Sequence, residues 1–152
     1  MKKVIILFIT LSSISLVFAS KTYGDDLLEN VYKEVRIDKN LNKLEDFYEG
    51  GCPIYNSTYF QKGIINKAVV RVICNYEGTI DVRFLGDSDT IQSMTFRGDS
   101  SYEKEKSCKS FDKKLRKMLS LSKTFILLKM KVIRVNEVTK NTELAFDSII
   151  IH

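Results

Sequence analysis

The stretch Val70–Phe84, VRVICNYEGTIDVRF, decides the fold class of this chain. Apolar side chains recur at every second position on both sides of Glu77-Gly78, a dipeptide typical of a tight turn. A period of two places one side chain in the core and the next in solvent. The stretch therefore predicts an antiparallel β-hairpin.

The residues after this hairpin predict one more strand and then a helix. A weaker alternation over 90–97 indicates the strand. Ser100 and Glu103 have the spacing of a capping box, in which the side chains of the two residues satisfy backbone N–H groups at a helix start. We expect the helix to run to about Ser120, with an apolar stripe on one side.

The last third of the chain predicts two further strands. Residues 125–135 are rich in branched side chains, and their alternation slips between Val132 and Ile133, as it does at a β-bulge. A turn near Asn141 leads into a closing strand over 144–151.

The N-terminal third shows a different pattern. Within 20–50, apolar residues such as Leu28, Val31 and Val35 fall at helical spacing, which predicts an N-terminal helix or two shorter ones. Gly50-Gly51 ends this segment, and 51–63 is expected to be a linker to a domain that occupies 64–152. Within the linker, Tyr55, Tyr59 and Phe60 lie in a polar, irregular stretch that fits either a short strand or a loop.

The predicted fold is α+β and mostly β: an N-terminal helix, then strand, strand, strand, helix, strand, strand. This order over 64–151 resembles the OB-fold, a small five-stranded barrel. In element order alone it is similar to the secreted B subunits of bacterial enterotoxins, which implies an oligomeric receptor- or glycan-binding subunit. The chain has no Trp, so the family's sugar-binding Trp has no counterpart. A cystatin-like helix wrapped by a curved sheet remains an alternative.

The first residues predict export. Lys2 and Lys3 precede an apolar run, and Val17-Phe18-Ala19 has the short side chains of a cleavage site, so 1–19 is interpreted as a signal peptide. We expect a secreted or periplasmic protein with no integral membrane segment once the signal is removed.

Cys52, Cys74 and Cys108 would then lie in an oxidising compartment, where one disulfide and one free thiol are expected. If the first and third strands after the linker run the same way, Cys74 lies at the end of the sheet from which the helix departs. Cys74 and Cys108 are therefore the favoured pair, and the other pairings remain open.

Positive charge is concentrated late in the sequence. The chain has a formal net charge of +5, and residues 100–140 contain twelve basic and four acidic side chains. A basic surface of this kind can bind an anionic partner, or it can simply be solvated. The candidate basic patch consists of Lys109, Lys113, Lys114, Arg116, Lys117, Lys129 and Lys131.

Catalytic chemistry has little support. The single His is the last residue, His152, which argues against imidazole catalysis and His-ligated metals, and no glycine-rich phosphate loop precedes a helix. We expect no enzyme activity and no cofactor.

The sequence argues against nucleic acid as a partner, because few aromatic residues lie among the basic ones. The predicted function is a non-catalytic binding module for a protein, glycan or anionic ligand, with a second copy of the chain as a further candidate partner. Its alternatives are a monomeric periplasmic binder of a small or anionic ligand, a cystatin-like inhibitor, or a hydrolase built on carboxylates.

Overall fold

The structure of this protein is a computed structural model that describes residues 30–43, 48–85 and 92–152. The predicted signal peptide and the first residues of the predicted N-terminal helix lie outside these ranges. The chain divides between Val31 and Tyr32, and the fold described below is that of the unit Tyr32–His152.

This unit is built mainly from strands. Its helices are the long α2 (Ser101–Leu121) and a single 3-10 turn, η1 (Lys39–Leu41). The strands of the described residues are β1 (Tyr32–Asp38), β2 (Tyr48–Glu49), β3 (Cys52–Gln61), β4 (Ile64–Ile73), β5 (Thr79–Phe84), β6 (Gln92–Thr95), β7 (Phe125–Val135) and β8 (Thr142–Ile151).

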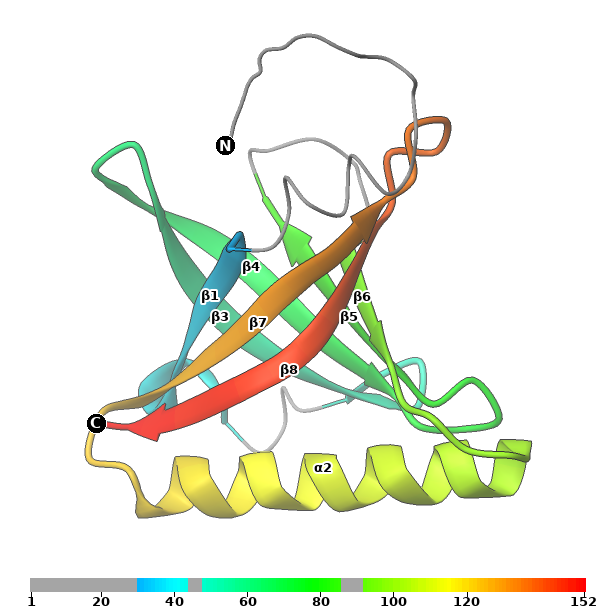
Figure 1. The fold of residues 1–152 in the computed structure, drawn as a ribbon. Helices are drawn as coiled ribbons and strands as arrows, with labels where there is room; N and C mark the ends of the chain where they lie inside the picture. Colours follow the sequence, from blue (N-terminus) through cyan, green and yellow to red (C-terminus); the bar gives the residue numbers. More distant parts are fainter. Residues whose placement is uncertain (1–29, 44–47, 86–91) are drawn as a thin grey trace, which may run out of the picture. The chain divides into compact units, whose positions relative to one another are not determined.

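Seven of these strands close into a barrel (Figure 1). Around the barrel the order is β1, β7, β8, β6, β5, β4 and β3, and β3 then pairs with β1 to complete the circle. The pairing of β6 with β8 is parallel and every other pairing is antiparallel. The two-residue β2 pairs with the start of β3 and lies outside the circle.

The elements predicted from Val70 onward agree with the structure. The hairpin is the pair β4 and β5, in register from Ala68↔Phe84 to Ile73↔Thr79. Its inward side chains, including Val70 and Val82, are fully buried. Strand β7 also has the expected bulge, because its register with β8 shifts between Val132 and Arg134.

The predicted N-terminal helix is wrong where the structure describes it. Residues Tyr32–Asp38 form strand β1, with Val35 and Ile37 completely buried inside the barrel. Val31 and Val35 fit a helical period, but Val35 and Ile37 also fit a period of two. Pairing with β7 along all seven residues decides between the two periods, and local propensity does not.

The segment 51–63, expected to be a linker, contains the ten-residue strand β3. Its inward side chains Tyr55, Ser57 and Tyr59 alternate, but the polar Asn56 and Thr58 between them hide the pattern in the sequence. Strands β1 and β3 therefore complete a seven-stranded barrel in place of the predicted five-stranded one. The helix lies in the middle of the chain and not at its start.

Helix α2 lies across one end of the barrel (Figure 1). Its buried face consists of Cys108, Phe111, Asp112, Leu115 and Leu119, close to the predicted stripe. The Ser100 hydroxyl accepts a hydrogen bond from the Glu103 N–H at 3.2 Å, as the capping box requires.

At the other end of α2, the Lys39 ammonium donates hydrogen bonds to the carbonyl oxygens of Ser120 and Ser122 at 3.1 and 2.9 Å. A cation at this position also complements the helix dipole. The turn η1 therefore holds the C-terminal end of α2 next to strand β1.

We predict that Gly78→Ala lowers the free energy of unfolding by about 2–4 kcal/mol. Gly78 has φ +59°, and a Cβ there would lie 2.8 Å from the Lys104 carbonyl oxygen of α2. Gly63 also has a positive φ but faces open space, so Gly63→Ala should cost only about 1–2 kcal/mol. Urea denaturation of both variants measures the difference, and equal losses would contradict the close packing of α2 on this turn.

Candidate functional site

The barrel closes incompletely where β1 meets β3. Strand β1 pairs with β7 at all seven of its residues but with β3 only at Arg36↔Thr58 and Ile37↔Ser57. If the pairing continued, Val35 would lie opposite Tyr59, but the strands are not paired there. We call this junction the seam.

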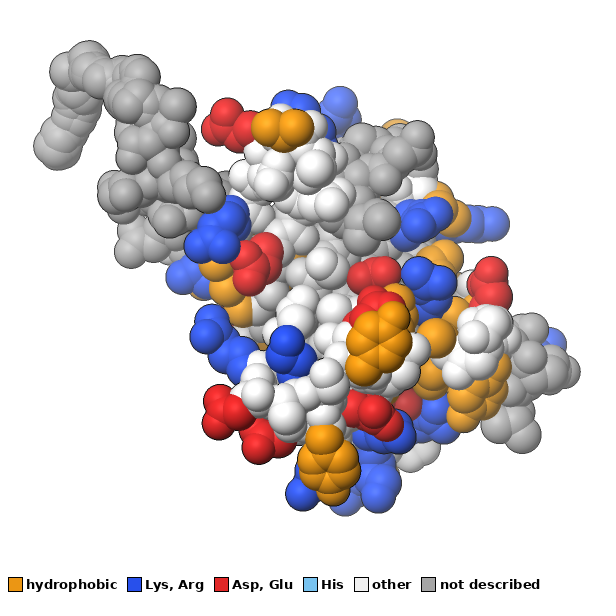
Figure 2. All heavy atoms as spheres, turned by 90° about the vertical axis from the view of Figure 1, so that its right-hand side faces the viewer, with side chains coloured by type: hydrophobic (Ala, Val, Ile, Leu, Met, Phe, Trp, Pro, Cys, Tyr) orange, Lys and Arg blue, Asp and Glu red, His pale blue; other side chains and the backbone are white. Residues whose placement is uncertain are grey.

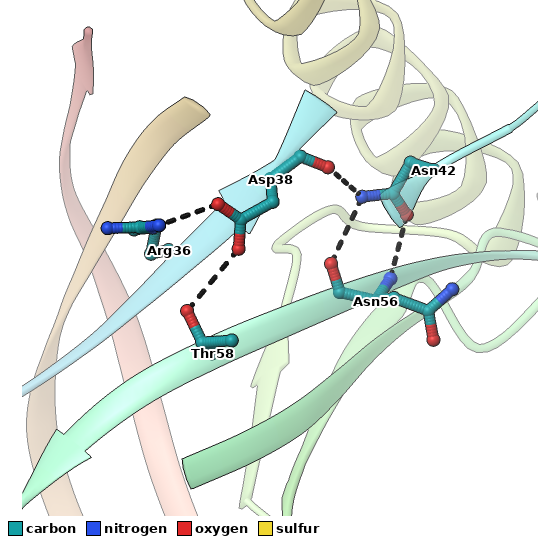
Figure 3. Close-up of polar contacts among 5 residues, drawn as sticks. All are labelled: Arg36, Asp38, Asn42, Asn56 and Thr58. Atoms are coloured by element: carbon teal, nitrogen blue, oxygen red, sulfur yellow. Dashed lines mark hydrogen bonds and ion pairs between the residues drawn. The ribbon is translucent and has the colours of Figure 1, made fainter. Parts of the chain in front are cut away.

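At its closed end the seam depends on one buried amide (Figure 3). The Asn42 side chain donates hydrogen bonds to the carbonyl oxygens of Asp38 and Asn56, at 2.6 and 3.0 Å. Its own oxygen accepts a hydrogen bond from the Asn56 N–H at 2.7 Å. The amide thus takes the place of a strand residue at the position where β1 turns away from β3.

A second set of polar contacts lies beside the paired residues (Figure 3). The Asp38 carboxylate binds the Arg36 Nε at 2.9 Å and accepts a longer hydrogen bond from the Thr58 hydroxyl at 3.4 Å. The exposed Arg36 guanidinium also lies 4.3 Å from the centre of the Phe125 ring. The negative charge of Asp38 is therefore already paired with the Arg36 guanidinium.

Where the two strands separate, the seam opens into a groove of about 710 Å³, which we call the seam groove. Apolar and aromatic side chains from several strands form much of its lining: Tyr59, Phe60, Ile65, Phe84, Phe125 and Leu127. Tyr59 and Phe84 pack edge to face, with ring centres 4.6 Å apart. Both rings point inward, so the groove reaches from the outer surface toward the barrel interior.

Two lysines line the groove. Lys33 is half-buried on the inward side of β1, and its ammonium lies 5.5 Å from the centre of the Phe84 ring. Within the described part of the chain, no carboxylate forms an ion pair with it. Lys129 lies 4.5 Å from the Tyr32 ring and opposite Glu34 in the β1–β7 register. Among the Lys and Arg side chains that line the groove, Lys33 is thus the one without an ion pair or a carboxylate opposite it in the register, although Glu34 also lines the groove.

The predicted basic patch is not one surface. Its five helix residues, Lys109, Lys113, Lys114, Arg116 and Lys117, lie on α2, whereas Lys129 and Lys131 lie on β7. Lys129 lines the seam groove, but Lys109, Lys113 and Arg116 line a separate hollow of about 530 Å³. Figure 2 shows Lys and Arg mixed with Asp and Glu on the flank where α2 begins.

Several helix cations already have partners. Lys109 binds Glu105 at 2.7 Å, and Lys114 lies 5.3 Å from the centre of the Phe146 ring. Arg116 binds Asp112 at 3.0 Å and donates to the Tyr48 hydroxyl at 3.0 Å. Paired, exposed charges of this kind contribute little binding energy, so the helix is a weaker candidate for an anion site than the groove.

Asp112 also joins the helix to the barrel. It accepts a 2.5 Å hydrogen bond from the Tyr55 hydroxyl, which is buried inside the barrel. Burial, the hydrogen bond and the negative charge of Asp112 raise the pKa of Tyr55 far above its ordinary value, so the phenol stays protonated. Burial works against the charge of Arg116, but its hydrogen bond to Tyr48 and the charge of Asp112 raise its pKa overall. These contacts of Asp112 and Arg116 link α2 to Tyr55 of β3 and to Tyr48 of β2.

The cysteines lie near this cluster. Cys74 at the end of β4 and Cys108 on α2 form a disulfide, the pairing favoured from the sequence, with Cα atoms 5.3 Å apart. Such a link contributes about 2–4 kcal/mol. Cys52 is a half-buried free thiol that lines the same hollow as Cys74.

The described residues hold neither a metal-binding cluster nor a membrane-spanning helix. They contain no group of three or more His, Cys, Asp or Glu side chains placed to hold a metal ion. In the same part of the chain, no helix has both the length and the hydropathy to cross a membrane.

Comparison with known proteins does not assign the chain to a family. No protein-family model, curated protein or solved structure matches it. The small barrel is therefore established by the structure alone, and the resemblance to enterotoxin B subunits has no independent support.

Sequence reasoning missed most of the groove. The sequence predicts a helix at Lys33, and a linker with either a short strand or a loop at Tyr59 and Phe60. The available signal was the alternation of Tyr55, Ser57 and Tyr59, which predicts a strand once Ser57 is accepted as an inward residue. The position of Lys33 beside Phe84 has no sequence signal, because it depends on how β1 completes the barrel.

We predict that Asn42→Ala lowers the free energy of unfolding by about 2–3 kcal/mol, because it leaves two backbone carbonyls and one N–H without their partner. The half-buried Asn66 makes one hydrogen bond, to the Ile64 carbonyl two residues away, so Asn66→Ala should change stability by less than about 1 kcal/mol.

Hydrogen exchange locates the effect of Asn42→Ala. Backbone amides of β1 should exchange faster, whereas those of β5, which lies away from the seam, should change much less. A uniform increase across the barrel would mean that Asn42 stabilises the fold without controlling the seam.

Proposed function

We propose that this protein is a non-catalytic binding protein that holds a small amphipathic anion in the seam groove. The observation that carries the proposal is Lys33, a half-buried cation beside the Phe84 ring with no carboxylate partner among the described residues. A half-buried cation among apolar and aromatic groove residues favours a ligand with one negative group and a hydrophobic body.

The dimensions of the groove agree with a small ligand. Its volume of about 710 Å³ falls within the usual range of small-molecule sites, roughly 300–1,000 Å³. Phe60, Ile65 and Leu127 offer apolar contacts toward the surface, and Lys33 offers the charge toward the interior. A carboxylate or sulfonate could thus bind the ammonium while its hydrophobic part contacts the outer walls.

This reading favours the small-ligand alternative over an oligomeric glycan-binding subunit. A ring of barrels needs a strand edge that is free to pair with the neighbouring subunit. Among the described strands, the barrel members with a free edge are β1 and β3 at the open part of the seam and β8 after Glu143, since β6 pairs with β8 only at Gln92↔Thr142 and Ser93↔Glu143. The preference for a small ligand therefore rests on Lys33 and the groove, and the oligomeric subunit remains the alternative. Export remains part of the proposal, and the Cys74–Cys108 disulfide is compatible with it.

The lack of catalytic activity also remains a proposal. Glu105 and Asp112 are two carboxylates that line the same hollow, as a carboxylate hydrolase would require. Each is engaged, however: Glu105 with Lys109, and Asp112 with Arg116 and Tyr55. Their bonds favour a structural role for both.

We predict that anilinonaphthalene sulfonate, a fluorescent aromatic anion, binds the folded protein at one saturable site. Lys33→Met should weaken this binding about ten-fold or more, because a bond to a charged group contributes about 1.5–3 kcal/mol. Fluorescence titration measures both affinities, and added decanoate should displace the probe.

Lys117→Met is the matched control, since Lys117 is an exposed helix lysine that does not line the groove. It should bind the probe as the unmodified protein does. Equal weakening in both variants, or fluorescence that never saturates, would sink the proposed function. Circular dichroism of each variant establishes that it is folded.

A further inference from the structure

The β3–β4 hairpin ends in an unusual cluster of exposed apolar side chains. Phe60, Ile64 and Ile65 are 71%, 64% and 62% exposed. Phe60 lies directly opposite Ile65 in the register, and Ile64 lies opposite Gln61. Phe60 and Ile65 share one face of the hairpin and Ile64 lies on the other, because successive side chains of a strand point to opposite faces. Single exposed apolar residues are normal on a protein surface, but three at one hairpin end indicate an interaction site. We call these three residues the hairpin tip.

The tip is held in an extended position. Strands β3 and β4 pair without interruption at eight positions, and only Lys62 and Gly63 connect them. Both connecting residues have positive φ, 52° and 79°, the geometry of a tight two-residue hairpin turn. Figure 1 shows this turn projecting at the end of the barrel away from α2. Because the turn is so short, the apolar residues cannot fold back onto the barrel.

The charge of the hairpin has a single sign. Between Glu49 and Glu77 the sequence has no Asp or Glu. Lys62 and Lys67 are exposed on the hairpin, and Arg71, farther from the tip, pairs with Asp81. Apolar residues flanked by cations, with no carboxylate between them, have the chemistry that binds the interface of an anionic membrane.

We propose that the hairpin tip inserts Phe60, Ile64 and Ile65 into the interface of an anionic phospholipid membrane, with Lys62 and Lys67 at the headgroups. Phe60 and Ile65 also line the seam groove, but the membrane proposal does not require the groove to hold a ligand. A lipid surface is favoured over a protein because the tip projects, whereas protein interfaces of useful size need a broad complementary face.

The absence of Trp from the chain permits a direct test. Phe60→Trp introduces a single fluorescent reporter at the tip. Its emission should shift to the blue with vesicles of phosphatidylcholine that contain about one-third phosphatidylglycerol, and much less with phosphatidylcholine alone. Val138, 91% exposed in the β7–β8 connection, provides the control Val138→Trp, which should show no shift.

Sedimentation with the same vesicles tests the residues themselves. Ile64→Asp should lower the constant for binding to these vesicles by roughly ten-fold or more, since a carboxylate enters the interface poorly and is repelled by anionic lipid. Val138→Asp makes the same kind of change elsewhere and should leave binding unchanged. Added salt should weaken binding by the unmodified protein.

The outcomes separate this inference from the proposed function. Ile64 does not line the seam groove, so Ile64→Asp should still bind anilinonaphthalene sulfonate. Lys33→Met should still bind vesicles. No sedimentation of the unmodified protein, or equal blue shifts for the two Trp variants, overturns the membrane inference and would direct attention to a protein partner for the tip.

Discussion

The architecture depends on a short contact between β1 and β3, where only two residue pairs complete a circle of seven strands. The Asn42 amide extends this contact by bonding the backbone of Asp38 and Asn56, as a strand neighbour would. A buried amide is stable in such a place only when its donors and acceptor are satisfied. The closure of the barrel at the seam and the hydrogen bonds of the Asn42 amide therefore depend on each other.

Helix α2 closes one end of the barrel by a combination of apolar and polar contacts. Leu115 is completely buried, while Asp112 on the same face reaches Tyr55 in the barrel interior. The Cys74–Cys108 disulfide fixes the first half of the helix, and Lys39 binds its C-terminal carbonyls. These attachments stabilise the end of the barrel opposite the hairpin tip (Figure 1).

The groove follows from the incomplete seam, and the hairpin tip lies next to it. Because β1 and β3 separate beyond Arg36 and Thr58, aromatic side chains and Lys33 are accessible from outside. Phe60 and Ile65 contribute both to the lining of the groove and to the exposed tip. If both proposals hold, a hydrophobic anion released from a membrane would meet the groove at the point where the protein touches the lipid.

Local patterns were sufficient for every element from Val70 onward, since Gly78, the Ser100 cap and the alternation of 125–135 act over a few residues. They also favoured the Cys74–Cys108 pair. The sequence by itself thus determined the hairpin, the helix and most of the β content. Tertiary structure alone decided that Tyr32–Asp38 is a strand and that Lys33 lies beside Phe84. The physical reason is that β1 gains its hydrogen bonds and its burial from β7, some ninety residues away, and no local pattern encodes a partner at that distance.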